Sequence, residues 1–325
     1  MARRYYPGTT SQRWETPVPA PSRTLDVAVC TYRRPERVTA LIPLLLEQGR
    51  ALEDVDARVV IVDNDAAGSA RDAIASALGG EEGLVVVVEE APGLTAARNR
   101  ALSEAEDRDL LVFIDDDETP HDGWLAALLA LQAERRPAGV AGPVLSAFEA
   151  EPDAWVAASP VWMRRRRATG TPVPSAGAGN LLLDMSVVRR LGLCFDPRFA
   201  FTGGEDTFFT RALVRDGGEL LWCDEAVATE SVPADRLTRE WVLTRARRNG
   251  EAWAMVRVLT AAPGERRALR ARLAARGAAL AAVNGARARL TRDVARRAEL
   301  DHRAAGALGI LRAAMTGRVT EEYAR

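Results

Sequence analysis

The chain has 325 residues, of which 47% are hydrophobic and 27% charged, a composition that excludes a chain disordered throughout and a collagen-like repeat. Its 3 cysteines are too few for a disulfide framework, and its 2 histidines leave little room for a histidine-based metal site or a serine–histidine–aspartate triad. Residues 236–325 hold 20 arginines and 8 acidic residues, whereas residues 1–235 hold 24 arginines and 37 acidic residues. Because the C-terminal part is strongly basic, we expect a negatively charged surface or ligand as a partner.

Strand-like and helical segments alternate along the first half of the chain. Residues 1–24, which are polar and rich in proline, are interpreted as a flexible arm. Strands are then predicted at 25–32, 57–64, 83–90 and 109–117, and helices at 37–48, 69–78, 93–105 and 123–134. This alternation predicts an α/β fold, Rossmann-like in its layering, with a mostly parallel central sheet and helices on both faces.

The pattern is less regular after residue 135. We predict a strand at 139–148, an irregular stretch at 149–179, a strand and a helix within 180–192, a helix at 204–218 and a strand at 219–230. From residue 236 onward, arginine and alanine at helical spacing predict a helical extension. No run of 18 uncharged apolar residues and no N-terminal apolar signal segment is present, so we expect a cytoplasmic protein.

Polar residues follow three of the predicted strands. Thr31–Arg34 follow the first strand, Asp63–Asp65 follow the second, and the fourth ends in Asp115–Asp117. Ligands of open α/β sheets bind beyond the carboxyl ends of the strands. Three adjacent carboxylates stay ionised only where cations or hydrogen-bond donors neutralise them, and Mg²⁺ or Mn²⁺, which bridges carboxylate to phosphate, would do so. The alternative interpretation is a solvated acidic turn.

Six motifs occur in a characteristic order, namely CTYRRPERV, VDNDAAGSAR, GLTAARNRAL, FIDDDETP, TGGEDTFF and ESVPADR. Together they resemble the family 2 glycosyltransferases, which are inverting nucleotide-sugar enzymes of GT-A fold, and in particular the bacterial succinoglycan-type exopolysaccharide glycosyltransferases. The resemblance implies a GT-A domain at 25–250, with a nucleotide-sugar half at 25–135 and an acceptor half at 136–250. The arginine-rich helical extension would occupy 251–325.

The resemblance also implies a set of residues that bind the nucleotide-sugar donor. Thr31, Tyr32 and Asp63 would hold the uracil and ribose of a UDP-sugar, and Asp116 would contact the ribose. Asp117 would ligate the divalent metal, Mn²⁺ or Mg²⁺. The remaining donor-site residues, which would support this pocket, are Arg33, Arg98 and Asp115.

The same resemblance implies a general base and an acceptor site. Asp206, within the Glu205–Asp206 pair, would take the proton of the acceptor hydroxyl, as inverting transfer requires, while the metal stabilises the departing diphosphate. Read from spacing alone, this acidic pair is also a typical helix start. Our candidates for the acceptor site are Trp162, Asn180 and Gly204. For Trp155 and Trp162 two interpretations stay open, a place in the core or a platform on which an acceptor sugar stacks, whereas Trp241 is expected in the core.

The last motif departs from the family pattern. Related sequences often have a histidine shortly before the V-P-x-x-R segment, where it can complete the metal site. Here the corresponding residue is Thr229, and Glu230 beside it is an alternative oxygen ligand. The identity of the metal is therefore left open.

The function that the resemblance implies is transfer of a sugar, glucose being one candidate, from a UDP-sugar to a lipid-linked oligosaccharide in exopolysaccharide or other surface-glycan synthesis. A nucleotidyltransferase is a second interpretation, but it would need a glycine-rich phosphate loop that CTYRRPERV lacks. A nucleic-acid-binding protein that uses the arginine-rich tail is a third. The acidic body of the chain disfavours it, so we expect no nucleic acid as a partner.

The arginine-rich tail mixes charge with apolar residues at helical spacing. The apolar residues are Leu269, Leu273, Leu280, Val283, Leu290 and Val294. Basic side chains are attracted to anionic lipid, and the tail carries too much charge to span a bilayer. We therefore expect residues 251–325 to bind the inner face of the bacterial plasma membrane peripherally. The alternative is a helical pair that only covers the catalytic domain.

Overall fold

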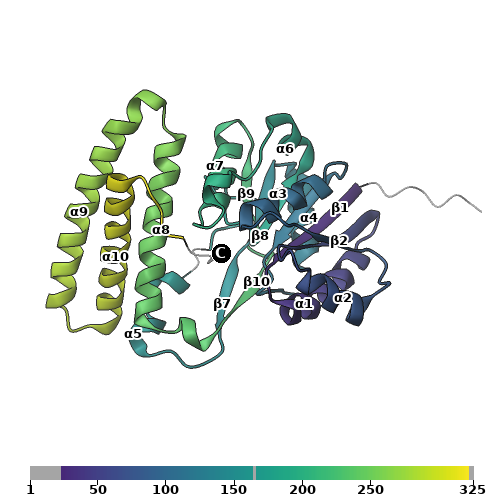
Figure 1. Cartoon of the computed structure of the whole chain (residues 1–325), viewed down its shortest axis with the longest axis horizontal. Helices are drawn as coiled ribbons and strands as arrows, with labels where there is room; N and C mark the ends of the chain where they lie inside the picture. Colours follow the sequence, from purple (N-terminus) through teal and green to yellow (C-terminus); the bar gives the residue numbers. More distant parts are fainter. Residues whose placement is uncertain (1–22, 164–165, 322–325) are drawn as a thin grey trace, which may run out of the picture.

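The computed structural model describes residues 23–163 and 166–321. The predicted N-terminal arm therefore lies outside the described residues, apart from Arg23 and Thr24, which begin the first strand. In the first half, the strands are β1 (Arg23–Thr31), β2 (Val55–Asp63), β3 (Leu84–Val88) and β4 (Leu110–Ile114), and the helices are α1 (Pro35–Arg50), α2 (Ser69–Leu78), α3 (Leu94–Glu104) and α4 (Trp124–Arg135). Helices α1, α2 and α3 each directly follow one strand, as the alternating pattern predicts, and a short strand, β5 (Glu118–Pro120), lies between β4 and α4 (Figure 1).

The central sheet has seven strands in the order β3-β2-β1-β4-β8-β6-β9, where β8 is Asn180–Asp184, β6 is Gly139–Ala141 and β9 is Leu220–Trp222. Strands β1 to β4 pair in parallel, and β8 alone runs against its neighbours β4 and β6. The structure confirms the predicted α/β fold with a mostly parallel sheet. The carboxyl ends of β1, β2 and β4 consequently lie at one edge.

Two of the predicted strands are each divided into two. The segment 139–148 forms β6 and then β7 (Val144–Phe148), and the segment 219–230 forms β9 and then β10 (Ala228–Val232). The later strand of each pair joins a second, three-stranded sheet in the order β5-β10-β7, where β5 is Glu118–Pro120. Gly142 marks the crossing, because a Cβ there would lie 2.2 Å from the carbonyl oxygen of Ala226.

Short elements connect these sheets. In the segment 149–179, which we predicted to be irregular, the described residues form the one-turn helix α5 (Ala154–Ala157) and a 3₁₀ turn at Pro160–Trp162. Helix α6 (Met185–Leu191) follows β8, and α7 (Glu205–Arg215) follows a 3₁₀ turn at Pro197–Phe199. A further 3₁₀ turn at Ala234–Arg236 leads from β10 into the C-terminal helices.

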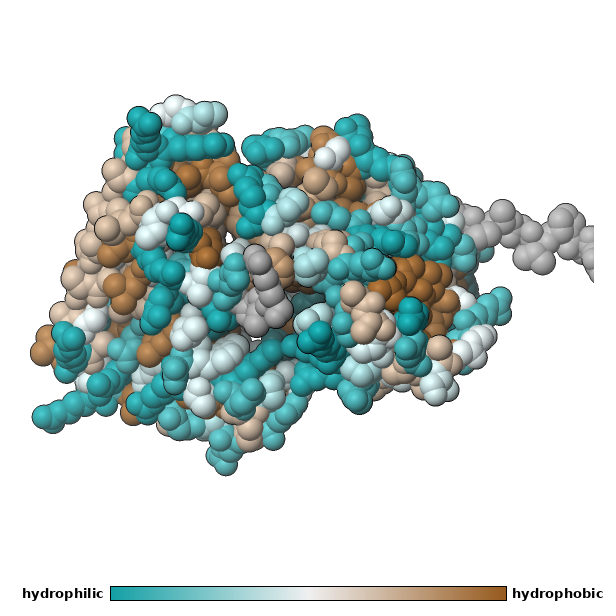
Figure 2. All heavy atoms as spheres, in the orientation of Figure 1, coloured by the Kyte–Doolittle hydropathy of each residue, from teal (hydrophilic) through white to brown (hydrophobic). Residues whose placement is uncertain are grey.

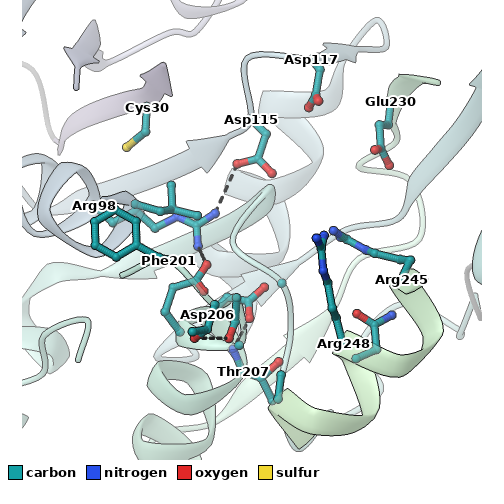
Figure 3. A pocket seen from close by; sticks show the side chains of 18 of the residues that line it. Cys30, Arg98, Asp115, Asp117, Phe201, Asp206, Thr207, Glu230, Arg245 and Arg248 are labelled. Atoms are coloured by element: carbon teal, nitrogen blue, oxygen red, sulfur yellow. Dashed lines mark hydrogen bonds and ion pairs between the residues drawn. The ribbon is translucent and has the colours of Figure 1, made fainter. Parts of the chain in front are cut away.

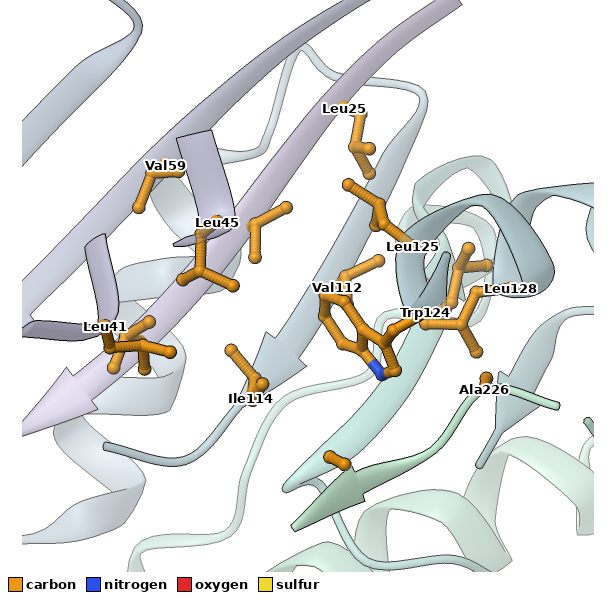
Figure 4. Close-up of a cluster of buried hydrophobic side chains, with 14 of the residues drawn as sticks. Leu25, Leu41, Leu45, Val59, Val112, Ile114, Trp124, Leu125, Leu128 and Ala226 are labelled. Atoms are coloured by element: carbon orange, nitrogen blue, oxygen red, sulfur yellow. The ribbon is translucent and has the colours of Figure 1, made fainter. Parts of the chain in front are cut away.

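The hydrophobic core lies on both faces of the central sheet. Alternate residues of β1 face opposite sides, so Leu25 packs under α1 and α4 while Ala28 packs under α3. On the first face, Leu41 and Leu45 of α1 meet Trp124 of α4 over the sheet (Figure 4). Burial on both faces explains why these strands read as continuous apolar runs.

Three long helices end the described chain, namely α8 (Arg239–Thr260), α9 (Arg266–Leu290) and α10 (Val294–Thr316). Helix α8 lies between the α/β domain and the other two helices (Figure 1). It runs without a break through residue 250, where we expected the catalytic domain to end. In the part of the chain that the structure describes, no helix is both long and apolar enough to cross a membrane.

Glycines bring α8 and α10 into close contact. A Cβ on Gly250 of α8 would lie 2.0 Å from the carbonyl oxygen of Gly306, and a Cβ on Gly309 of α10 would lie 2.0 Å from that of Arg247. The buried carboxylate of Glu251 adds an ion pair, 2.7 Å long, with the guanidinium of Arg312. Because the two backbones touch, the position of α8 against the domain depends on the α10 packing.

Candidate active site

A cavity of about 880 Å³ opens where β1 and β4 end. Its walls come from the loops after these strands, the start of α3, strands β7 and β10, the segment 201–207 and one face of α8. Figure 3 shows Arg98, Asp115 and Asp206 on one side of this space, and Arg245 and Arg248 of α8 on the other. The volume is within the range of ordinary ligand pockets.

All three strand-end aspartates lie beside arginines, and two of them, Asp116 and Asp117, share Arg34. Asp116 is buried and accepts hydrogen bonds from the Thr31 hydroxyl and the Arg34 guanidinium, each 2.8 Å long. The Asp117 carboxylate lies 3.4 Å from Arg34 and 3.8 Å from Arg236. The acidic strand end is therefore a charge-paired wall of the cavity, and not the solvated turn that we considered as an alternative.

Arg98 of α3 is a buried cation between two carboxylates. Its guanidinium forms an ion pair with Glu205 and another, 3.3 Å long, with Asp115. Burial alone would lower the pKa of Arg98, but the carboxylates of Glu205 and Asp115 raise it, so the side chain stays charged. Arg98 therefore links the start of α7 to the end of β4, and its role in ordering the pocket stays a prediction.

Glu205 and Asp206 begin α7 after Gly204, whose φ of 94° is left-handed. Burial raises the pKa of Glu205 to about 7, against the opposing effect of Arg98. No described residue hydrogen-bonds its second carboxylate oxygen. Asp206 lines the cavity, and a Cβ on Gly177 would lie 3.4 Å from its carboxylate. The two acids thus differ: Glu205 is buried beside Arg98, whereas Asp206 faces the space where a substrate would bind.

Carboxylates crowd the floor of the cavity. Burial raises the pKa of Asp115 to about 6, and burial together with Asp115 raises the pKa of Glu118 well above its usual range. Glu230 adds a further carboxylate, 3.5 Å from Arg236. This crowding favours an added cation.

The geometry limits how such a cation could bind. Among residues 23–163 and 166–321, no three histidine, cysteine, aspartate or glutamate side chains converge to hold a metal ion. Mg²⁺ in nucleotide sites usually takes only one or two protein carboxylates and completes its shell with water and substrate phosphates. The residues at this strand end therefore fit a metal that binds together with a diphosphate.

Three of the predicted site residues do not line the cavity. Both Asp63 oxygens accept backbone N–H groups, from Asp65 and from Ala70 and Arg71 at the start of α2. Arg33 is largely exposed, and its guanidinium lies 3.7 Å from Asp65. The buried Asn180 amide donates to the Pro143 and Ala226 carbonyls and accepts from Trp124. The remaining predicted residues line the cavity, namely Thr31, Tyr32, Arg98, Asp115, Asp116, Asp117, Trp162, Gly204, Glu205 and Asp206.

Thr229, at the position where related sequences often have histidine, also lies outside the cavity lining. Thr229 is hydrogen-bonded to the ring of His121, 2.7 Å away, and is not among the residues that line the cavity. Its neighbour Glu230 does line it, as we expected of an alternative oxygen ligand. Alternation along β10 explains the difference, because successive side chains point to opposite faces.

Helix α8 supplies residues that the sequence analysis assigned to no site. Arg245, Arg248 and Trp253 line the cavity. Trp241, expected in the core, is only partly buried and also lines it, with its ring stacked on that of Trp162 at 5.4 Å between centroids. The available signal was the spacing of Trp241, Arg245 and Arg248 at steps of four and three, which places these three residues on one face of a helix.

The sheet order, the acidic end of β4 and the cavity beside it are those of an α/β protein that binds its ligand at the carboxyl ends of its strands. The chain belongs to the glycosyl transferase family 2, whose family model matches residues 26–192. It is 33% identical over 241 residues to the succinoglycan biosynthesis protein ExoM of Rhizobium meliloti (strain 1021), a match that covers 71% of this chain and 75% of that protein. The predicted family is confirmed.

Solved structures share the fold. The mannosyltransferase PcManGT from Pyrobaculum calidifontis, in complex with GDP-Man and Mn²⁺, superposes with a TM-score of 0.61 at 19% identity, over 95% of this chain and 92% of its own. GalNAc-T7 with UDP, GalNAc and Mn²⁺ superposes with a TM-score of 0.50 at 14% identity, over 74% of this chain. This chain matches 52% of the GalNAc-T7 chain, or about half its length.

Proposed function

We propose that the chain transfers one sugar, with inversion, from a UDP-sugar to a lipid-linked saccharide in the synthesis of a bacterial exopolysaccharide. The observation that carries the proposal is the cavity at the end of β4, where Asp115–Asp117 and Asp206 line the same space of about 880 Å³. The relationship to ExoM supports the exopolysaccharide context. The UDP in the GalNAc-T7 structure and the GDP-Man in the PcManGT structure support a sugar-nucleotide donor.

The donor would bind along the ends of β1 and β4. Thr31 and Tyr32 would contact the base and ribose, and Asp116, which the Thr31 hydroxyl already holds, would contact the ribose. Asp63 would support the donor site without touching the donor. Its hydrogen bonds to the start of α2 fix the loop in which Asn64 lines the cavity. Arg33, which is largely exposed, would lie at the rim of this donor site.

Asp117 would hold a divalent metal, Mn²⁺ or Mg²⁺, together with the donor diphosphate. When bound, the metal would stabilise the negative charge of the leaving diphosphate. The guanidinium groups of Arg34 and Arg236, which now lie near Asp117, would contribute positive charge to the same phosphates. Glu230 and Glu118 stand close enough to help balance the charge.

Asp206 would be the general base. Its carboxylate would take the proton of the acceptor hydroxyl while that oxygen forms a bond to the anomeric carbon of the donor sugar. The bond from this carbon to the diphosphate breaks on the opposite face, and its electron pair leaves with UDP. Buried Glu205 would position Arg98 and the start of α7 instead of reacting itself. The saccharide acceptor would enter beside Trp162 and Gly204, whereas Asn180 would support this region from the core.

We further propose that the C-terminal helices bind an anionic membrane surface, on the cytoplasmic side where nucleotide sugars are present. The structure divides the apolar set of the tail: Leu273 is buried between the helices, whereas Leu280, Val283 and Leu290 are 37, 53 and 85% exposed. These three leave an apolar stripe along α9, and Figure 2 shows hydrophobic residues interspersed with hydrophilic ones on the outer side of this helical unit.

Arginines share this stripe on α9. Three exposed arginines and the three exposed apolar residues of this stripe succeed one another at steps of three or four residues, which places them on one face of the helix. In chain order they are Arg272, Arg276, Leu280, Val283, Arg287 and Leu290. Each basic side chain near anionic lipid contributes about 1 kcal/mol. Such a face fits peripheral binding, with arginines on phosphate groups and the apolar residues at the lipid boundary.

A donor panel tests the proposed function. The full chain is incubated with UDP-, GDP- and dTDP-sugars and Mn²⁺, without acceptor, and release of the nucleoside diphosphate is measured. We expect slow hydrolysis confined to one or more UDP-sugars. Hydrolysis of GDP- or dTDP-sugars alone would replace the proposed donor, and the absence of binding and hydrolysis for every sugar nucleotide would overturn the function.

A further inference from the structure

Helix α8 presents one face to the cavity and the other to α10. The residues on the cavity face include Trp241, Arg245, Arg248, Ala252 and Val256. Gly250, on the other face, is pressed against Gly306 of α10. The Thr238 side chain caps the start of the helix by accepting the backbone N–H of Trp241. The cavity face of α8 is therefore held in a fixed position.

Arg245 and Arg248 place two positive charges on this wall. They stand about one helical turn apart and are half-buried. Figure 3 shows both side chains extending from α8 into the cavity, on the far side from Asp206. The Arg245 guanidinium lies over the Trp241 ring, 6.0 Å from its centre, where a cation–π interaction stabilises it.

The other cavity arginines belong to the strand-end wall. Arg34 lies 2.8 Å from Asp116, Arg236 lies 3.8 Å from Asp117, and Arg98 is buried against Glu205. A donor diphosphate that binds at Asp117 would meet Arg34 and Arg236 first. The arginine pair of α8 is then a second cationic group, on the α8 side of the cavity.

We infer that Arg245 and Arg248 form a phosphate-binding site for the acceptor, which would be a saccharide joined to its lipid through a phosphate or diphosphate ester. This inference rests on the proposed function. Guanidinium groups bind phosphate oxygens in pairs, and two of them match the charge of a phosphate dianion better than that of a single carboxylate. The aromatic rings of Trp241 and Trp253 beside the pair offer apolar contact for the sugar or the first part of the lipid.

The same chemistry could be supplied by the second phosphate of the donor, so the test separates the two sources. The enzyme is first saturated with UDP and Mn²⁺, which fills the donor site, and geranyl diphosphate is then titrated by calorimetry. Geraniol, which lacks the phosphates, serves as the ligand control. We compare the wild-type chain with Arg245→Gln, Arg248→Gln, and Arg247→Gln as a matched control, since Arg247 is exposed and does not line the cavity.

We expect the wild-type complex to bind geranyl diphosphate and not geraniol. Each cavity variant should weaken this binding about tenfold or more, Arg247→Gln should leave it within twofold, and UDP affinity should be unchanged throughout. A loss of UDP affinity in the cavity variants would assign the pair to the donor. Geranyl diphosphate binding that is absent in the wild type, or equal in all variants, would overturn the site. Retained UDP binding and donor hydrolysis in the wild type would show that the proposed function itself stands.

Discussion

Asp117 lies 3.4 Å from the guanidinium of Arg34 and within 4.0 Å of Arg37 and Arg236. Positive charge at this carboxylate can therefore come from arginine or from a metal, and the two can be distinguished by experiment. We expect Asp117→Asn to remove the Mn²⁺ dependence of UDP binding and to lower donor hydrolysis about 100-fold, because the metal would lose its anionic ligand. Calorimetry with and without Mn²⁺ measures both effects.

The control for this variant is Asp122→Asn, which makes the same chemical change at an exposed residue outside the cavity. It should behave as the wild type. Full wild-type activity in excess EDTA would show that the arginines alone neutralise the diphosphate, and the metal proposal would be wrong.

Asp206, which lines the cavity, is the carboxylate that we propose as the general base. Asp206→Asn keeps its shape and removes its basicity, so transfer to an acceptor should fall by roughly 10²–10⁴, as for loss of a general base. UDP affinity should stay within about twofold, because the proposed donor contacts do not include this residue. Transfer rates and UDP titrations on the same preparation check both halves of the prediction. A variant that loses UDP binding instead would make Asp206 a structural residue.

The buried pair of Glu205 and Arg98 should make stability depend on pH. The pKa of Glu205 is about 7 in the folded protein, above the ordinary value of 4.5, so the folded state binds more protons than the unfolded state between these values. Through this group, lowering the pH from 8 to 5 stabilises the fold. The gain in unfolding free energy should be larger in the wild type than in Glu205→Gln by roughly 1–3 kcal/mol. Urea unfolding at both pH values measures it, and equal gains in the two proteins would mean that Arg98 keeps Glu205 ionised throughout.

Particular residues show how far a site can be predicted from sequence. Asp115–Asp117 were predictable because an acidic cluster at the end of an apolar strand has to face a ligand or a counter-charge. Asp63 follows the same rule at the end of β2, yet it faces the N–H groups at the start of α2. Which way such a side chain turns depends on the loop that follows, and no periodicity records that. Asn180 is a similar case, since its partners lie far away in sequence.

At the scale of the elements, the contact between α8 and α10 sets one wall of the active site. Gly250→Ala would place a methyl group 2.0 Å from the carbonyl oxygen of Gly306, so α8 would have to move. We expect a loss of about 3 kcal/mol in unfolding free energy, in line with overpacked cores, together with weaker acceptor binding. Chemical denaturation and the geranyl diphosphate titration measure the two effects.

Gly285→Ala is the matched control, because this glycine of α9 has open space where a Cβ would lie. It should stabilise the protein by about 0.5–1 kcal/mol, since alanine favours the helix. If Gly250→Ala were as stable as Gly285→Ala, the close contact between α8 and α10 would not hold in solution.

Element prediction was accurate where one strand was followed by one helix, and it was wrong at two long strands. The segments 139–148 and 219–230 have continuous β-type patterns, but each divides where the chain passes from the central sheet to the smaller one. The change occurs at Gly142 and Pro143 in the first segment. A periodicity of two describes side chains along one sheet and does not reveal that the strand changes sheets.

At the scale of the whole molecule, the charge asymmetry of the sequence corresponds to a physical separation. The acidic α/β domain carries the cavity, and the arginine-rich helices lie to one side of it (Figure 1). Composition predicted this division. It did not predict that α8 would belong to both parts, because helix packing through Gly250 and Gly306 is a tertiary contact.

Membrane binding should depend on one face of α9. We expect the full chain to sediment with liposomes that contain anionic lipid, with binding that falls as salt increases. Arg276→Glu with Arg287→Glu reverses two charges on the exposed stripe and should lower the partition coefficient at least tenfold. Arg267→Glu with Arg289→Glu makes the same change in net charge elsewhere on α9 and should have a smaller effect. Equal losses in both double variants would point to diffuse electrostatics, and no binding by the wild type at low salt would leave these helices as a cover of the domain.

The central claim is that the cavity at the end of β4 holds a nucleotide diphosphate and a metal at Asp117. A crystal structure of the full chain with UDP and Mn²⁺, recorded with anomalous scattering at the manganese edge, tests it most directly. We expect a single strong manganese peak in contact with an Asp117 oxygen and the UDP phosphates, with the uracil beside Thr31 and Tyr32. UDP bound outside this cavity, or UDP within it and no manganese peak at Asp117, would contradict it.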